Sequence, residues 1–232
     1  MIEYQIEYRR SLDDPESFWR EQANSVAWSK KPSLILSKDT NDNDVWFADG
    51  ELNSCYLAVD QHIEKGRGEQ PALVYDSPVT GNKVSYTFIE VRDEVANLAG
   101  MLTNLGVVKG DRVIIYMPMI PQAAFAMLAC ARIGAIHSVV FGGFAAKELA
   151  TRIDDATPKV VLAASCGIEF AAVIEYKPLI DEAIRLAEHE IEHCVVWQRE
   201  EAEAELQNSW DKDWRLLLAH AEPADVVALR AT

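Results

Sequence analysis

The segment of residues 109–141 constrains the fold of this chain more than any other. A short apolar run over residues 113–117 follows a Gly-Asp turn, and a second apolar run spans Ile136–Phe141. Between them, Pro121–Ile133 is rich in Ala, Met and Leu, and Gly134 stands where a helix can end. This order predicts a β-α-β unit with parallel strands and a ligand crevice at their carboxyl ends.

Helix and strand signals alternate along the rest of the chain. Apolar positions at three-to-four spacing predict a helix over residues 88–105, preceded by Thr87 and ended by Gly106. Further helices are predicted over residues 15–23, 57–63, 145–153, 177–189 and 214–219, and strands over residues 72–75, 84–87, 160–163 and 194–197. Such alternation is typical of the α/β class, with a mostly parallel sheet flanked by helices.

The first 60 residues differ from the remainder. Residues 1–60 are irregular in pattern, and their aromatic side chains are expected to pack this lead segment on the body. Residues 61–232 carry the alternating pattern and are expected to form an α/β subdomain. Within them, the charge-rich stretch of residues 199–213 is interpreted as a solvated helix or loop.

Charge and cysteine spacing argue against several classes of function. The chain has 37 acidic and 22 basic residues, so its net charge of −15 would repel nucleic acid and anionic membranes. Its sequence has no apolar run of about 18 residues and no signal-peptide pattern, so a cytoplasmic location is expected. Four widely spaced cysteines, Cys55, Cys130, Cys166 and Cys194, are expected to be free thiols, and no metal site is predicted.

Several stretches resemble one enzyme family. They are the sequence of residues 110–144 and the shorter segments 14–19 (DPESFW), 52–56 (LNSCY), 66–73 (GRGEQPAL) and 152–156 (RIDDA). Together they resemble the AMP-forming acyl-CoA synthetases of the short-chain, acetyl- and propionyl-CoA synthetase branch. Residues 75–81, 165–169 and 175–179 look more like propionyl- than acetyl-CoA synthetases.

The resemblance implies the fold of an acyl-adenylate-forming ligase and an activity for the parent enzyme. That enzyme would use ATP, Mg and CoA to activate propionate or acetate as an acyl-adenylate and pass the acyl group to the thiol. The family's phosphate loop, ribose-binding aspartate and catalytic lysine would follow Thr232. The chain is therefore expected to be an inactive N-terminal fragment with an incomplete subdomain, without catalytic residues or tightly bound cofactors, and able to self-associate through exposed surface.

Two other functions stay open at this stage. A nucleotide-binding oxidoreductase would share the alternating pattern, but the chain lacks the Gly-x-Gly-x-x-Gly motif with a following acidic residue. A non-catalytic folding or interaction module is the other alternative. A Ser/Thr/Gly-rich phosphate loop following the chain would distinguish the ligase from both.

The candidate site is the turn Phe141-Gly142-Gly143. Two glycines after a strand let the backbone approach a ligand closely and adopt angles closed to other residues. The resemblance implies that this turn borders the tunnel for the pantetheine arm of CoA. The alternative is a tight turn without a ligand, since a Gly-Gly pair is a weak motif.

Four further residues bear on the function of this region. Where acetyl-CoA synthetase relatives hold CoA phosphates with arginines, the chain carries Glu169 and Ala172, and Lys177 is the nearest remaining cation. His137, in the second apolar run, is interpreted as a hydrogen-bonded core residue rather than an acid or base.

Overall fold

A parallel sheet of five strands organises the body of the molecule. The computed structural model describes residues 2–170 and 172–231. The strands lie in the order β12-β11-β8-β6-β7, and their bounds are Arg112–Met117 for β6, Ile136–Phe141 for β7, Val160–Ala164 for β8, His193–Trp197 for β11 and Asp211–Asp213 for β12. Of the three inner strands, β6 and β8 are almost wholly buried, which explains their continuous apolar sequence.

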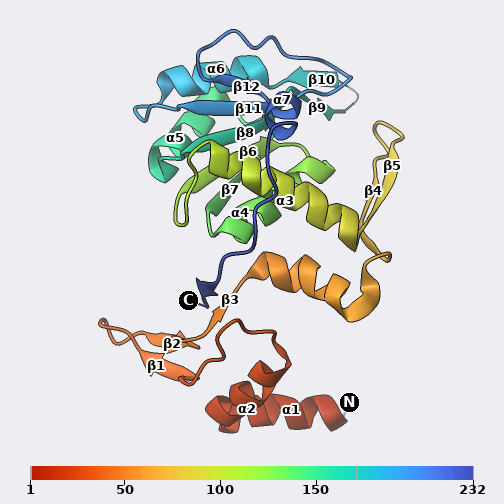
Figure 1. Cartoon of the computed structure of the whole chain (residues 1–232). Helices are drawn as coiled ribbons and strands as arrows, with labels where there is room; N and C mark the ends of the chain where they lie inside the picture. The colour runs from red at the N-terminus through yellow and green to blue at the C-terminus, as the bar shows by residue number, and fades with distance from the viewer. Residues whose placement is uncertain (1, 171, 232) are drawn as a thin grey trace.

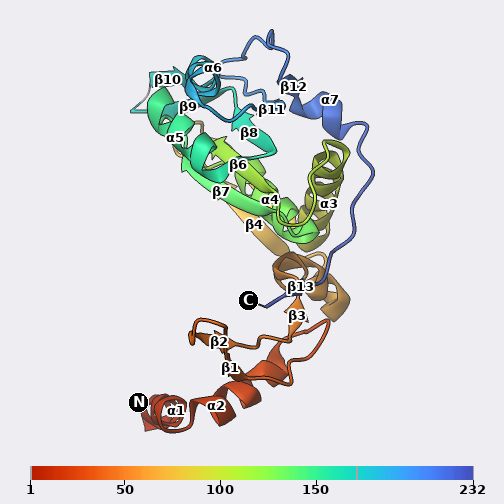
Figure 2. The ribbon, with the colours of Figure 1, turned by 90° about the vertical axis from the view of Figure 1, so that its left-hand side faces the viewer.

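Helices cover both faces of this sheet. Figure 2 shows α5 (Ala146–Ala156) and α6 (Lys177–Leu186) on one face and α3 (Phe88–Asn104) on the other, where α4 (Pro121–Ile133) packs beside α3. The predicted helix signals act as expected: Thr87 forms a capping box with Glu90, and Gly134 adopts a left-handed conformation with φ 77°. The predicted β-α-β unit is confirmed.

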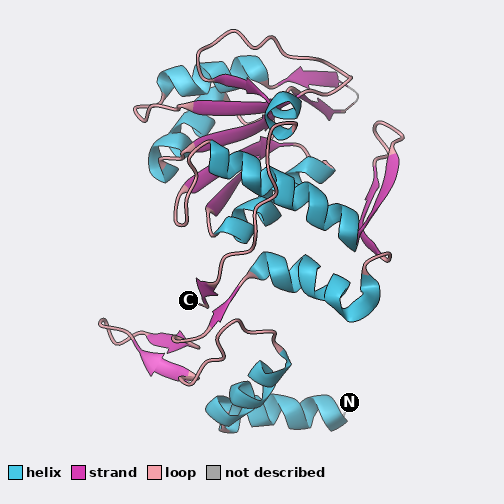
Figure 3. Ribbon diagram, viewed as in Figure 1, coloured by secondary structure: helices cyan, strands magenta, loops and turns pink. Residues whose placement is uncertain are grey.

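Two hairpins project from the body (Figure 3). The strands predicted over residues 72–75 and 84–87 are β4 (Pro71–Asp76) and β5 (Lys83–Thr87), which pair antiparallel. A second pair, β9 (Cys166–Glu169) with β10 (Ala172–Glu175), was not predicted. It lies near the carboxyl end of β8, so it stands at the same end of the sheet as the glycine turn.

The N-terminal residues form a separate group of elements. They are α1 (Ile2–Asp13), α2 (Pro15–Gln22), the short helix Ala23–Ser25, β1 (Leu36–Lys38), β2 (Asp44–Trp46) and β3 (Glu51–Leu52), followed by π-helical turns at Tyr56–Asp60 and Ile63–Arg67. Helix α1 was not predicted, because its charged and apolar residues alternate without one apolar face. In Figures 1 and 2, α1, α2 and β1–β2 lie away from the five-stranded sheet.

Aromatic rings in this N-terminal group contact one another. The ring centroids of Trp19 and Trp46 are 6.2 Å apart, those of Trp46 and Phe47 6.1 Å, and those of Trp28 and Phe47 5.5 Å. Aromatic pairs at such distances stabilise the segment that carries them. The division of the chain at residue 60 and the packing of residues 1–60 on the body stay predictions.

The end of the chain returns to this N-terminal group. After α7 (Trp214–Leu218), the chain runs back along α3 and α4 to β13 (Leu229–Arg230), which pairs antiparallel with β3 (Figure 1). The buried Asn53 side chain holds this C-terminal segment against α4. Its amide donates hydrogen bonds to the carbonyl oxygens of Ala131, Arg132 and Val227. Three distant parts of the sequence therefore meet at one amide group.

A buried ion pair lies beside this junction. The Arg132 guanidinium donates to the carboxylate of Asp60 at 3.0 and 3.1 Å and to the Ala224 carbonyl oxygen at 2.6 Å. The side chains of Arg132 and Asp60 are 6% and 15% exposed. The pair joins α4 to the π-helical turns and to the returning C-terminal segment.

Three sequence expectations need correction. The interpretation of His137 as a core residue implies that its strand is buried, but β7 is an edge strand of the sheet and exposes Ile136, Val139 and Phe141. His137 is also exposed there, so its interpretation as a core residue is wrong. Helix α6 ends at Leu186 rather than at residue 189, because Ala187 adopts an extended backbone conformation.

The charge-rich stretch after β11 also differs from expectation. Its last residues form β12, which pairs with β11 and extends the sheet. Arg199, at its start, has a side chain that is only 9% exposed. Part of the stretch therefore belongs to the sheet, and the expectation of a solvated helix or loop is wrong for that part.

Candidate functional site

A cavity lies at the carboxyl ends of β6 and β7, where the parallel sheet predicted a ligand crevice. Its volume is about 380 Å³. The walls come from the β4–β5 hairpin loop (residues 75–80), the residues that follow β6 (117–120), Val139, Phe141 and Gly142 of β7 and its turn, and Ile168, Glu169, Tyr176 and Arg199. Most of these side chains are apolar, so the cavity suits a ligand with few polar groups.

The glycine turn forms part of this cavity wall. Phe141 and Gly142 line it, and Gly143 follows with φ 96°, a conformation that favours glycine. The Tyr116 hydroxyl fixes the turn, because it accepts a hydrogen bond from the Gly143 N–H at 3.0 Å and donates one to the Phe144 carbonyl at 2.9 Å. These two hydrogen bonds hold the turn at the carboxyl end of β7.

Tyr176 packs directly behind the same turn. Its ring lies edge-on to Tyr116 with centroids 5.1 Å apart, and a Cβ atom on Gly142 would stand 2.6 Å from its hydroxyl oxygen. A Cβ on Gly167 of β9 would also collide with that oxygen. Burial raises the pKa of Tyr176 to about 12 and also raises the pKa of Tyr116. Both phenols are neutral donors at physiological pH.

The positions that replace the relatives' arginines lie at the end of the β9–β10 hairpin. The Glu169 carboxylate stands over the turn, since a Cβ on Gly143 would be 2.6 Å from its Oε1 atom. Ala172 is exposed on β10. Lys177 does not supply the missing charge, because its ammonium is bound by Asp181 at 2.6 Å and Asp211 at 2.9 Å.

Sequence reasoning missed Tyr176 and Arg199. Tyr176 immediately precedes α6, where spacing gives no sign of a ligand site. Arg199 follows the carboxyl end of β11, and the rule that ligands bind at that end of parallel strands could have found it. Its guanidinium donates to the Cys166 carbonyl oxygen at 3.0 Å and to Glu201 at 3.1 Å.

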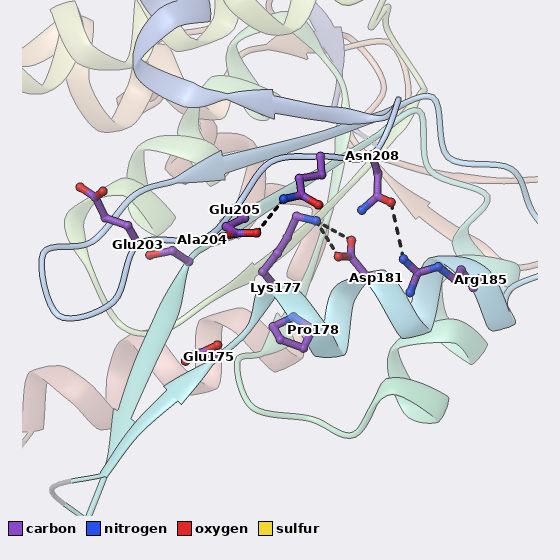
Figure 4. A pocket seen from close by; sticks show the side chains of 11 residues that line it. Glu175, Lys177, Pro178, Asp181, Arg185, Glu203, Ala204, Glu205 and Asn208 are labelled. Atoms are coloured by element: carbon purple, nitrogen blue, oxygen red, sulfur yellow. Dashed lines mark hydrogen bonds and ion pairs between the residues drawn. The ribbon is translucent and has the colours of Figure 1, made fainter.

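A second, larger cavity of about 600 Å³ lies beside α6. Figure 4 shows its side chains, with Lys177 directed at Asp181 and Arg185 at Asn208. Its wall also contains Glu175, Glu203 and Glu205, and the Lys177 ammonium is already paired. An acidic wall disfavours anionic ligands such as nucleotides, so the smaller cavity at the glycine turn is the better candidate.

Cysteine and metal chemistry find no support in the described part of the chain. The four cysteines are free and buried, and burial raises the pKa of Cys55 to about 11 and of Cys130 and Cys194 to about 12. Across residues 2–170 and 172–231, no group of three His, Cys, Asp or Glu side chains could hold a metal ion. Within the same residues, no helix is long and apolar enough to cross a membrane.

Comparison with known proteins places these features in a family. The family model described as "AMP-binding enzyme" matches residues 59–230, and "Acetyl-coenzyme A synthetase N-terminus" matches residues 4–58. The α/β fold with its crevice at the strand ends agrees with these matches. The chain belongs to the AMP-binding enzyme family.

Individual relatives show which members of the family the chain is similar to. An uncharacterized protein of Pseudomonas aeruginosa is 62% identical over 96% of this chain and 35% of its own length. The mitochondrial acyl-CoA synthetase short-chain family member 3 of Rattus norvegicus is 48% identical over 97% of this chain and 33% of its own. The propionate–CoA ligase of Escherichia coli is 44% identical over 83% of this chain and 30% of its own length. This chain therefore spans about a third of the length of these relatives.

A solved structure supports the same fold. The acetoacetyl-CoA synthetase from Streptomyces lividans superposes with a TM-score of 0.83 at 26% identity, over 96% of this chain and 34% of its own. The expected acyl-adenylate-forming ligase fold is thereby confirmed, and so is the resemblance to short-chain acyl-CoA synthetases.

Proposed function

We propose that this chain is the N-terminal part of an AMP-forming ligase that joins a short-chain carboxylic acid to CoA. The observation that carries the proposal is the apolar cavity at the carboxyl ends of β6 and β7, in a chain whose relatives include short-chain acyl-CoA synthetases. The parent enzyme would use ATP with Mg in the first step and CoA in the second. We expect it in the cytoplasm, in keeping with four free thiols.

The reaction has two balanced half-reactions. A carboxylate oxygen attacks the α-phosphorus of ATP, and pyrophosphate leaves with the broken phosphoanhydride bond. The CoA thiolate then attacks the acyl carbon, and AMP leaves. The second step requires a passage that admits the thiol and excludes water from the adenylate. We assign this passage to the cavity beside Phe141, Gly142 and Gly143.

Propionate is the acid that we favour. The stretches of residues 75–81, 165–169 and 175–179 support this choice through their likeness to propionyl-type sequences, and the E. coli relative bears the name propionate–CoA ligase. The full-length ligase should then have a higher kcat/KM for propionate than for acetate. Equal values, or a higher value for acetate, would contradict the assignment.

The isolated 232-residue chain is expected to lack ligase activity. The groups that would hold the phosphates of ATP and stabilise the adenylation step are assigned to the part of the parent enzyme outside this chain. With ATP, Mg, propionate and CoA, the chain should release pyrophosphate no faster than buffer alone, while the full-length ligase should turn over. Release well above background by the purified chain would refute this prediction.

A non-catalytic interaction module is the second candidate, and the exposed edge of β7 favours it. Ile136, Val139 and Phe141 are 55%, 50% and 65% exposed on this strand, and no described strand pairs with its outer edge. Such edges invite pairing with another chain. We expect the isolated chain to self-associate through β7.

Light scattering after size-exclusion chromatography tests this expectation. Val139→Lys should shift the chain toward monomer, because a lysine on an edge strand opposes edge-to-edge pairing. Leu216→Lys changes an equally apolar side chain, 68% exposed on α7, and should leave the distribution unchanged. A wild-type chain that stays monomeric at high concentration would exclude association through this edge.

A further inference from the structure

The hydroxyl group of Tyr176 is the unexplained polar group of the cavity. The residue is only 2% exposed, yet it lines the cavity at the glycine turn. Among the described residues, no side chain or backbone group makes a hydrogen bond with its oxygen. Tyr116 beside it differs, because its hydroxyl is satisfied by Gly143 and Phe144. The Tyr176 hydroxyl lines the cavity, so it is placed to donate a hydrogen bond to a group that enters there.

Packing alone does not account for this tyrosine. The ring fills the space between Gly142 and Gly167, and phenylalanine would fill it equally. The hydroxyl group is what distinguishes tyrosine from phenylalanine, and this residue lines the cavity. Tyrosine is therefore explained best if a ligand accepts its hydrogen bond.

The cavity defines which ligand could do so. Met117, Ile120, Val139, Phe141 and Ile168 supply apolar walls, which suit a mostly hydrocarbon arm. Tyr176 is a neutral donor over the physiological range, because burial raises its pKa to about 12. Because the walls around it are mostly apolar, we expect its partner to be a neutral acceptor, such as an amide carbonyl within the arm.

We propose that the Tyr176 hydroxyl donates a hydrogen bond to an amide carbonyl of the thiol-bearing arm and thereby positions the thiol beside the glycine turn. This inference rests on the function proposed above, under which the arm is the pantetheine part of CoA. Tyr176 is then a contact for the arm, while Tyr116 keeps the turn in shape. Glu169 lies on the same wall and its carboxylate would repel phosphate groups. Binding should therefore depend on the neutral arm more than on the phosphates.

Tyr176→Phe in the full-length ligase tests the proposal. The KM for CoA should rise about tenfold, which corresponds to the loss of one well-formed hydrogen bond. Propionate-dependent ATP–pyrophosphate exchange should fall much less, and the midpoint of urea unfolding should stay unchanged, since phenylalanine keeps the packing of the ring. Tyr56→Phe is the matched control, because its hydroxyl donates to the exposed Glu64 at 2.6 Å, outside the cavity.

A CoA analogue with a methylene in place of one pantetheine amide carbonyl provides a second test. If the replaced amide is the one that Tyr176 contacts, the analogue should have a kcat/KM about tenfold below that of CoA with the wild-type enzyme. With Tyr176→Phe, the kcat/KM values of the analogue and of CoA should differ little. An unchanged KM for CoA in Tyr176→Phe, in an enzyme that forms the thioester, would overturn the inference alone. A parallel loss of both half-reactions and of unfolding midpoint would overturn it in favour of a structural role. A wild-type enzyme without CoA-dependent thioester formation would overturn the proposed function and this inference together.

Discussion

Gly143→Leu in the full-length ligase is expected to block thioester formation while adenylate formation survives. Gly143 lies at the end of the cavity wall, and a Cβ atom there would stand 2.6 Å from the Glu169 carboxylate. Because Glu169 is exposed, its side chain can move aside, and the leucine would then occupy the passage. We expect kcat/KM for CoA to fall about 100-fold, as for a misplaced reacting group. The exchange of pyrophosphate into ATP measures the surviving step.

Gly110→Leu separates this effect from backbone strain. Gly110 has φ 90°, close to the 96° of Gly143, and apart from Gly110 itself and its two chain neighbours, no described residue has an atom within 4 Å of the Cβ position. It precedes β6, at the opposite end of the sheet from the cavity. Both variants should lose about 1–2 kcal/mol of stability through the left-handed conformation. If Gly143→Leu abolishes both half-reactions together with cooperative folding, Gly143 serves backbone conformation and the tunnel assignment fails.

Arg132→Met is expected to lower the free energy of unfolding of the chain by about 3–5 kcal/mol. The substitution removes the partner of the Asp60 carboxylate, whose side chain is 15% exposed, and also leaves the Ala224 carbonyl oxygen without its donor. A buried carboxylate without compensation destabilises the folded state far more than its pair stabilised it. Urea unfolding followed by tryptophan fluorescence measures the change.

Lys83→Met supplies the matched control. It breaks an ion pair with Asp76 at 2.7 Å, in which the two side chains are 73% and 56% exposed. Such exposed pairs contribute at most about 1 kcal/mol, so the unfolding curve should move little. Equal, small effects of the two substitutions would mean that water reaches Asp60, and the junction would then owe its stability to Asn53 and packing.

Much of the sheet could be predicted because its signals are local. Helix α4 begins at the proline and ends before the left-handed glycine that mark it in the sequence, and the capping box at Thr87 fixes the start of α3. The apolar run of β7 gave no such guidance about burial, since β7 lies at the sheet edge. Strand order depends on contacts between distant segments, which periodicity does not report.

The candidate site could be predicted only in part for the same reason. The glycine turn is visible in the sequence because glycine itself is the signal, and its neighbours in space are not. Tyr176 reaches the turn from the start of α6, and Arg199 from the end of β11. Their roles follow from burial and hydrogen bonding, which no spacing rule contains.

The pairing of β3 with β13 has a consequence during synthesis of the chain. Leu52 pairs with Leu229, so β3 leaves the ribosome long before its partner exists. At roughly 5–20 residues per second, the interval is on the order of ten seconds or more. Throughout it, Asn53 also lacks its acceptor at Val227. The nascent chain therefore passes through a period in which its N-terminal elements are accessible to chaperones and proteases while the sheet is still being made.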